Sequence, residues 1–194
     1  MKQLAAIALI AISLVPIAVA HEEKKRQSKY EEFVAKEGTV ILRVCYDLAG
    51  PRVTHGSARS VLIHAQEVHT GEEFYAVRIT HSTAGHAGGH LVAFLDRDEI
   101  DVLGKTIDRI QSDMKRIITA KKAETRLQYT TRSGFRFGFS HRPGASAEIF
   151  MTIGGRTVLL KNLADAKELV TKAQAKIQEL ESTEATPTVP AKAE

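Results

Sequence analysis

The sequence predicts an α+β protein, in which two amphipathic helices pack on antiparallel sheet. Between residues 40 and 160, short runs alternate apolar with polar residues, and this period of two is typical of strands buried on one face. Residues 100–117 and 163–180 instead repeat apolar residues every three or four positions, as amphipathic helices do. Turn pairs such as Thr70-Gly71 separate the strand runs and predict hairpins, which require antiparallel pairing.

Residues 1–20 are predicted to be an export signal. A positive start and an almost unbroken apolar run end in Ala18-Val19-Ala20, the small-x-small pattern of a signal peptidase site. An uncleaved membrane anchor is the alternative, but the run contains Pro16 and is short for a span of roughly 20 apolar residues. The sequence therefore predicts a periplasmic or secreted protein that begins at His21 and is not an integral membrane protein after cleavage.

The mature chain divides into three predicted segments. Residues 21–36 are highly charged and predict a lead-in or short helix. Residues 37–182 carry the strand and helix patterns and predict a single α+β domain. Residues 183–194 are rich in proline and small polar residues, which predicts a disordered tail.

The first half of the domain predicts four strands and a helix. The strands are expected at residues 40–47, 61–69, 73–81 and 91–95, with loops at 49–60 and 82–88. Asp96 precedes the helical pattern as a predicted N-cap, and Glu99 completes a pair resembling a capping box. Cys45, the only cysteine, lies within the first strand and is predicted to be a buried small hydrophobe.

The second half repeats this order. Strands are expected at residues 127–132, 135–141, 147–153 and 157–160, and Asn162 is the predicted N-cap of the second helix. Phe135, Phe137 and Phe139 alternate with polar or small residues, which predicts an aromatic face beneath the helices.

The two halves share a glycine pair, a strand and a helix cap at residues 88–96 and 154–162. This predicts two ββββα units, at residues 37–118 and 124–182; the alternative is that strand-to-helix junctions look alike by chance. The order of elements resembles that of the PUR and Whirly single-stranded nucleic-acid-binding folds. The resemblance implies a topology alone, because no stretch matches those families' nucleic-acid-contacting motifs and a fold does not carry a function.

Function is predicted mainly by exclusion. The sequence has no nucleophile elbow, no metalloprotease helix and no phosphate-binding glycine loop. The net charge of +4 is small and neither demands nor excludes a polyanion, while export argues against a nucleic-acid partner. We therefore expect a non-enzymatic binding or structural domain without a cofactor, whose partner is a protein or a component of the cell envelope.

Three imidazoles, at His81, His86 and His90, surround a glycine-rich loop. Imidazole is a ligand of Zn and Cu, so the cluster is a candidate metal site and defines an alternative function as a metal-binding protein. The competing interpretation is a solvated loop with incidental histidines, because the loop holds no Cys, Asp or Glu.

Arginines are concentrated in the second half, and Arg136 is predicted to lie on the face opposite the phenylalanines. With Arg132 and Arg142 it forms a candidate anion-binding face, which defines a second alternative, a polyanion-binding module. The competing interpretation is a sheet face kept soluble by its charge.

Overall fold

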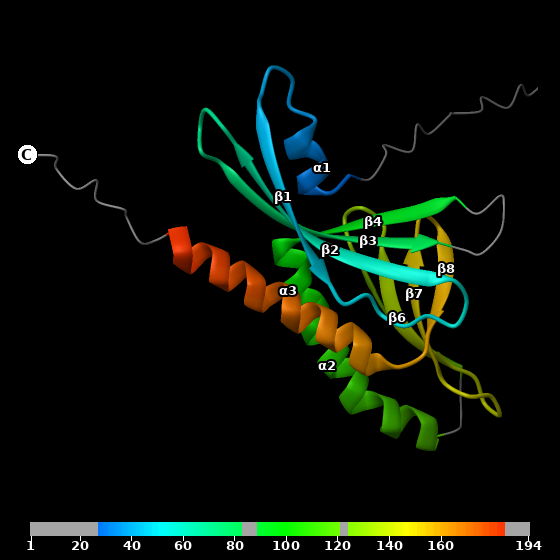
Figure 1. Cartoon of the computed structure of the whole chain (residues 1–194). Helices are drawn as coiled ribbons and strands as arrows, with labels where there is room; N and C mark the ends of the chain where they lie inside the picture. Colours follow the sequence, from blue (N-terminus) through cyan, green and yellow to red (C-terminus); the bar gives the residue numbers. More distant parts are fainter. Residues whose placement is uncertain (1–26, 83–88, 121–123, 185–194) are drawn as a thin grey trace, which may run out of the picture.

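The structure, a computed structural model, describes residues 27–82, 89–120 and 124–184. Two four-stranded antiparallel sheets and three helices confirm the predicted α+β class (Figure 1). Sheet A contains β1 (Ile41–Leu48), β2 (Ser57–Glu67), β3 (Glu73–Ser82) and β4 (His90–Asp96), and sheet B contains β5 (Thr125–Thr130), β6 (Arg136–His141), β7 (Glu148–Ile153) and β8 (Arg156–Leu160). The helices are α1 (Lys29–Val34), α2 (Arg97–Ala120) and α3 (Leu163–Glu184).

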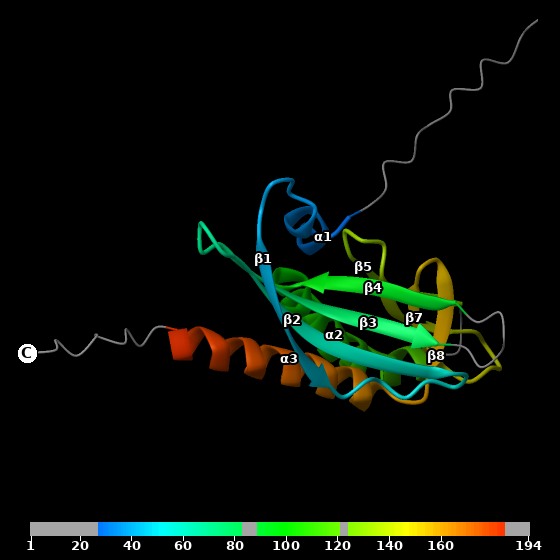
Figure 2. The same cartoon turned by 45° about the horizontal axis from the view of Figure 1, so that its top comes forward.

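Each sheet is a simple meander, with its strands side by side in chain order and a long helix after the fourth strand (Figure 2). This is the predicted order of two successive ββββα units. In sheet A, Val77 of β3 lies opposite Leu95 of β4. In sheet B, Phe137 of β6 lies opposite Met151 of β7. Both pairs are buried, so the register places apolar side chains on the inner face of each sheet.

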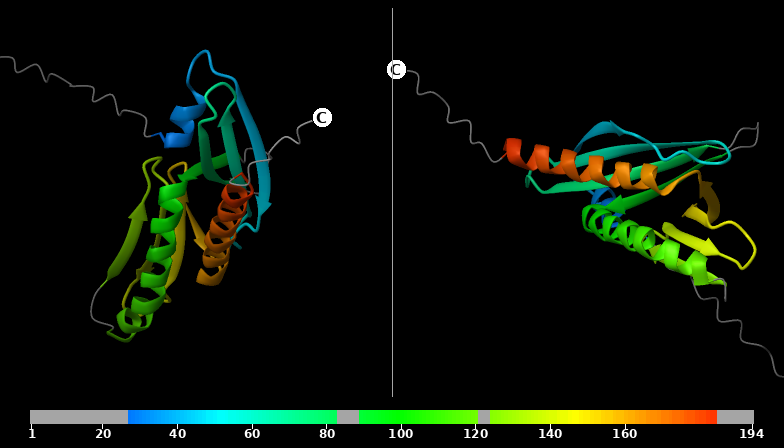
Figure 3. Two further views of the ribbon diagram at one scale, coloured as in Figure 1. Left: turned by 90° about the vertical axis from the view of Figure 1, so that its left-hand side faces the viewer. Right: turned by 90° about the horizontal axis from the view of Figure 1, so that it is seen from below.

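The main core lies between the two inner faces. α2 contacts strands of both sheets, whereas α3 contacts α2 and β1 (Figure 3). Ile107 of α2 and Phe139 of β6 are fully buried in this core. Phe137 and Phe139 are 2% and 0% exposed, as the alternating pattern predicts for residues beneath the helices. No helix among the described residues is both long and apolar enough to cross a membrane.

A second, smaller core lies on the outer face of sheet A. The charged lead-in forms α1 there, because Ser28 accepts the Glu31 N–H while the Glu31 side chain accepts the Ser28 N–H, a complete capping box. Tyr30 and Phe33 of α1 pack against β2 and β3, with the Tyr30 ring centroid 5.1 Å from that of Phe94. Sheet A is therefore covered on its outer face over only part of its area.

Asp96 caps α1 and not α2, which corrects the sequence prediction. Its two carboxylate oxygens accept the N–H groups of Lys29, at 2.8 Å, and Tyr30, at 3.1 Å, in the first turn of α1. Only half of the predicted capping box forms, in which the Asp96 N–H donates to Glu99 Oε2 at 3.1 Å. Asp96 is 1% exposed at the end of β4, and the N–H groups in the first turn of α1 satisfy its buried carboxylate there.

The predicted loop at residues 49–60 is shorter than expected, because β2 begins at Ser57. Gly56 allows this start: its φ is +80°, and a Cβ there would lie 2.2 Å from the Ser82 carbonyl oxygen. Before it, Val53 forms a β-bridge with Leu160 of β8. The first unit thus supplies the outermost backbone segment of sheet B.

An ion pair holds this segment to the start of α3. The Arg52 side chain donates to both carboxylate oxygens of Asp165 at 2.9 Å, and the Arg52 N–H donates to Asp165 Oδ2. These hydrogen bonds lower the pKa of Asp165 to about 2. Asn162 is the N-cap of α3 as predicted, since its Oδ1 accepts the Asp165 N–H at 2.9 Å.

Candidate functional site

The outer face of sheet A carries a cluster of polar side chains beyond the area that α1 covers. We call it the polar face; its members, from β2, β3 and β4, are Ser57, Arg59, Arg78, Thr80, Ser82 and His90. Together with Val92 they line a pocket of about 500 Å³. Among the residues that the structure describes, the pocket lining contains cationic and hydroxyl groups and no carboxylate, so its chemistry suits an anionic ligand.

The strand register brings these side chains together. Arg59 lies opposite Thr80, and Ser82 lies opposite both Ser57 and His90 on its two neighbouring strands. Directly opposed residues of antiparallel strands point to the same face. Alternate residues of β3 also point to the same face, so Arg78 lies on it together with Thr80 and Ser82.

The two arginines of the polar face differ in their partners. Arg59 donates to Asp47 Oδ1 at 2.7 Å, in an ion pair that is more than 70% exposed on both sides. Arg78 forms no ion pair within the described residues. A solvent-exposed guanidinium that forms no ion pair with a described carboxylate is the group of this face best placed to receive an anion.

Tyr30 of α1 lies near arginines of sheet A. Burial raises the pKa of Tyr30, while the nearby Arg43 and Arg78 guanidinium groups act in the opposite direction. By the strand register, Arg43 on β1 lies on the same face of sheet A as Arg78.

His90 has an ordered place on the polar face. Its Nδ1 lies 2.8 Å from Ser82 Oγ. When the Ser82 hydroxyl donates to Nδ1, the imidazole carries its proton on Nε2 and presents a donor to a ligand.

The structure does not bring His81 and His90, two of the three predicted metal ligands, together. His81 is buried, and its Nε2 lies 3.0 Å from the carbonyl oxygen of His55. His90 lies on the opposite face of the sheet, because it opposes Ser82, the neighbour of His81 in β3. These two imidazoles therefore point away from each other. His86 lies outside the described residues, and a metal site that uses it stays a prediction.

The described residues contain no group of three His, Cys, Asp or Glu side chains that could hold a metal ion.

Arg132 does not lie on an open sheet face. It occupies the turn between β5 and β6, where its Nη2 donates to Asp96 at 2.9 Å and to Asp98 at 2.6 Å. The backbone N–H of Arg132 donates to Glu99 Oε1 at 2.7 Å. The hydrogen bond from Arg132 is the largest influence that lowers the pKa of Asp98 to about 2, whereas burial raises the pKa of Glu99. We call these four residues the junction cluster, because they join β4, α2 and sheet B.

The other two predicted anion ligands are separated along sheet B. Arg136 is exposed at the start of β6, and Arg142 follows the end of the same strand, where it donates to Glu124 at 3.1 Å. The pocket nearest to Arg142 is about 300 Å³ and is lined by Glu124 and Glu148 as well as by arginines. The three predicted arginines thus form no common face, and the structure places the more uniformly cationic surface on sheet A.

Sequence reasoning missed the polar face although its pattern is present. Arg78, Thr80 and Ser82 alternate with buried Val77, Ile79 and His81. The same period of two identified the phenylalanine face of β6. What the pattern could not give is the pairing with Arg59, because β2 begins inside a segment that was expected to be a loop.

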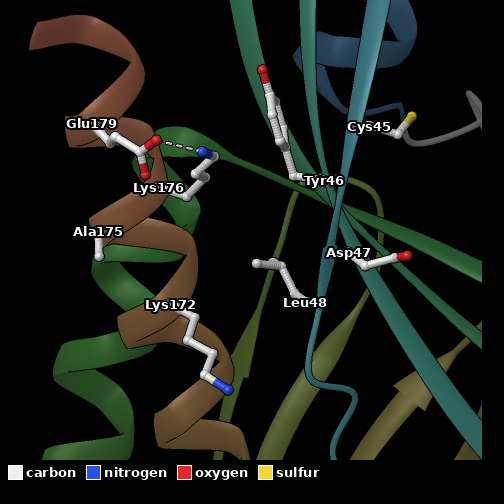
Figure 4. A pocket seen from close by; sticks show the side chains of 8 residues that line it. All are labelled: Cys45, Tyr46, Asp47, Leu48, Lys172, Ala175, Lys176 and Glu179. Atoms are coloured by element: carbon white, nitrogen blue, oxygen red, sulfur yellow. Dashed lines mark hydrogen bonds and ion pairs between the residues drawn. The ribbon is translucent and has the colours of Figure 1, made fainter. Parts of the chain in front are cut away.

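A second concave surface lies between β1 and α3 (Figure 4). It has a volume of about 590 Å³ and is bordered by Tyr46 and Leu48, which point toward α3, and by Lys176, whose Nζ lies 4.7 Å from the Tyr46 ring centroid. Cys45 points to the other side of the strand and is exposed, contrary to the prediction of a buried thiol. The reason is its position on an edge strand, beyond the reach of α1.

Comparison with protein-family models, with curated proteins and with solved structures gives no match for this chain. The likeness to the PUR and Whirly folds remains a resemblance in the order of elements.

Proposed function

We propose that this chain is an exported, non-enzymatic binding domain that takes an anionic ligand on its polar face. Export is supported by the leader of residues 1–20, with its small-residue cleavage pattern. The ligand class is supported by one observation above all: the described residues that line the pocket of the polar face supply two arginines, three hydroxyls and an imidazole, and no carboxylate.

The ligand class that fits this surface is a polymer carrying phosphate, sulfate or carboxylate groups. Guanidinium groups bind such oxyanions through paired N–H donors, and hydroxyls complete their hydrogen bonding. An exported protein meets acidic polymers of the cell envelope or its surroundings, which agrees with the expectation of an envelope component as the partner.

Heparin is a suitable probe of this proposal. We expect Arg78→Gln to weaken heparin binding about fivefold to tenfold at low salt, because one exposed guanidinium without a carboxylate partner is removed. The slope of log K against log salt concentration should become shallower by roughly one. Titration calorimetry or fluorescence anisotropy at several salt concentrations measures both quantities.

Arg136→Gln is the matched control, because it removes another exposed strand arginine, which lies on sheet B. It should change heparin affinity by less than about twofold. If Arg136→Gln weakens binding as much as Arg78→Gln does, the ligand uses general surface charge and the assignment to the polar face fails. Retention of full affinity by Arg78→Gln also refutes that assignment.

Export is tested by the mass of the protein recovered from its native host. The expected form lies outside the cytoplasm and starts at His21, and Ala20→Asp should block cleavage because signal peptidase requires a small residue there. Lys2→Arg, which keeps the positive start, is the control and should be processed normally. An intact Met1 on cytoplasmic protein would exclude export.

A further inference from the structure

The free edge of β1 is an unpaired strand with a defined hydrogen-bonding pattern. Within the described residues, β1 pairs with β2 alone. The Val40 carbonyl oxygen accepts the Val68 N–H, so even-numbered residues of β1 direct their backbone groups to β2. Because this direction alternates along a strand, Arg43, Cys45 and Asp47 direct their N–H and C=O groups to the open edge.

The edge of β8, by contrast, is covered by the chain itself. Val53 bridges Leu160, and the Lys161 N–H donates to the Arg52 carbonyl oxygen at 2.9 Å. An uncovered edge of eight residues without proline is a surface that readily adds a further strand.

Apolar side chains accompany the open edge. Leu42 and Val44 of β1 are 55% and 39% exposed, and Val40 and Val68 beside them are similarly exposed. All four lie on the inner face of sheet A, which Tyr46 and Leu48 share closer to α3. The inner face of β1 is thus covered at one end and bare at the other, as expected of a surface that receives a partner.

We propose that β1 pairs with β1 of a second copy of this chain, antiparallel and about a two-fold axis at Cys45. In this register Arg43 lies opposite the partner's Asp47, and Asp47 opposite the partner's Arg43. On the other face Leu42 meets the partner's Leu48, and Val44 meets the partner's Tyr46. Such self-complementarity is what a two-fold interface requires.

Neighbouring registers lack this charge complementarity. An axis at Arg43 places two guanidinium groups opposite each other, and an axis at Asp47 places two carboxylates opposite each other. The existing partner of Asp47 does not prevent the new pair, because Arg59 contacts Oδ1 and leaves Oδ2 as an acceptor. Arg43 likewise has five N–H donors, of which the Tyr30 hydroxyl can take only part.

Charge reversal tests the register, and it needs no heparin, so its outcome is independent of the proposed function. Arg43→Asp and Asp47→Arg each place like charges opposite one another at two symmetric positions. Each single variant should raise the dimer dissociation constant at least about tenfold. The double variant should restore it to within about threefold of the wild type, since the pairs re-form with opposite polarity. Sedimentation velocity over a concentration series measures these constants.

Arg136→Asp is the control for charge alone and should leave the dimer unchanged, because Arg136 lies on sheet B. Far-UV circular dichroism of each variant separates loss of the dimer from loss of the fold. A protein that is monomeric at every concentration overturns the proposal, and so does a dimer that is indifferent to both single variants.

Cys45 supplies a second, covalent readout. Opposed residues of a hydrogen-bonded antiparallel pair have Cα atoms about 5.5 Å apart, within the range that a disulfide spans. The oxidant diamide is added to cross-link the dimer. It accepts two electrons and two protons from the two Cys45 thiols as their S–S bond forms. The wild type should yield a covalent dimer on a non-reducing gel, Arg43→Asp should yield much less, and Cys45→Ser should yield none. Equal cross-linking of the wild type and Arg43→Asp would contradict the register.

Discussion

Replacing Arg132 by methionine is expected to lower the free energy of unfolding by about 3 kcal/mol. Asp96 is 1% exposed, so its carboxylate stays buried when the guanidinium is lost, and breaking one side of a buried ion pair typically costs about 3–5 kcal/mol. We expect the lower end of this energy range because Arg132 itself is 40% exposed. In addition, the Lys29 and Tyr30 N–H groups still bind Asp96 in the variant. Urea denaturation followed by circular dichroism measures the change.

The effect of Arg132→Met should shrink in acid. The pKa of Asp98 is about 2 in the folded protein, below its ordinary value, so its ionised form stabilises the fold above about pH 4. That contribution is lost as the pH falls toward 2. In the variant, protonation of Glu99, whose pKa burial raises, also removes one of the buried charges that Arg132 no longer pairs. The difference in free energy of unfolding between the wild type and Arg132→Met should therefore become smaller as the pH falls from about 5 to about 2. Arg136→Met, the control, should change stability by less than about 0.5 kcal/mol, and a similar loss in both variants would contradict the role of the junction cluster.

Gly138→Val is expected to destabilise sheet B by about 3 kcal/mol or more, and to lower the melting temperature by roughly 6–12 °C. A Cβ at Gly138 would lie 2.3 Å from the Leu127 carbonyl oxygen and 2.8 Å from Cζ of Phe150. The Phe150 ring cannot move freely, because it is only 3% exposed, and the Arg126 guanidinium also lies over it, 4.5 Å from its centroid. The backbone of β5 cannot retreat without breaking its ladder with β6.

Gly89→Val is the matched substitution, since a Cβ there would meet nothing within 4 Å and its φ is not positive. It should shift the melting temperature by less than about 2 °C. If Gly138→Val is too unstable to purify, Gly138→Ala replaces it, because it carries the same backbone clash. Its melting temperature should lie between those expected for Gly138→Val and Gly89→Val. A melting temperature of Gly138→Ala equal to that of the wild type would show that the strands can absorb the clash.

The sequence predicted the fold wherever one periodicity governed a whole segment. The phenylalanines of β6 and the apolar stripe of α2, including Ile107, are buried as expected because burial of an alternating or helical face depends on local pattern. Turn pairs such as Gly154-Gly155 predict hairpins because turn conformation also depends on local sequence. Both glycines adopt the positive φ that a tight hairpin turn requires.

Contacts between distant segments could not be predicted in this way. Nothing near Asp96 in the sequence indicates that it caps a helix 66 residues earlier or binds Arg132. The sequence pattern alone therefore assigns Arg132 to an anion-binding face. It also predicts a buried Cys45, because residue type alone does not reveal which strand lies at an edge. The polar face itself combines three strands, and only their register shows that Arg59 and His90 share it.

The bridge between Val53 and Leu160 makes the two halves inseparable. The outermost ladder of the second sheet belongs to the first half, and the first long helix fills the space beneath both sheets. Neither half can be excised with its own complete hydrophobic interior. Because the two repeats share one hydrophobic core, we expect them to unfold together in a single cooperative transition.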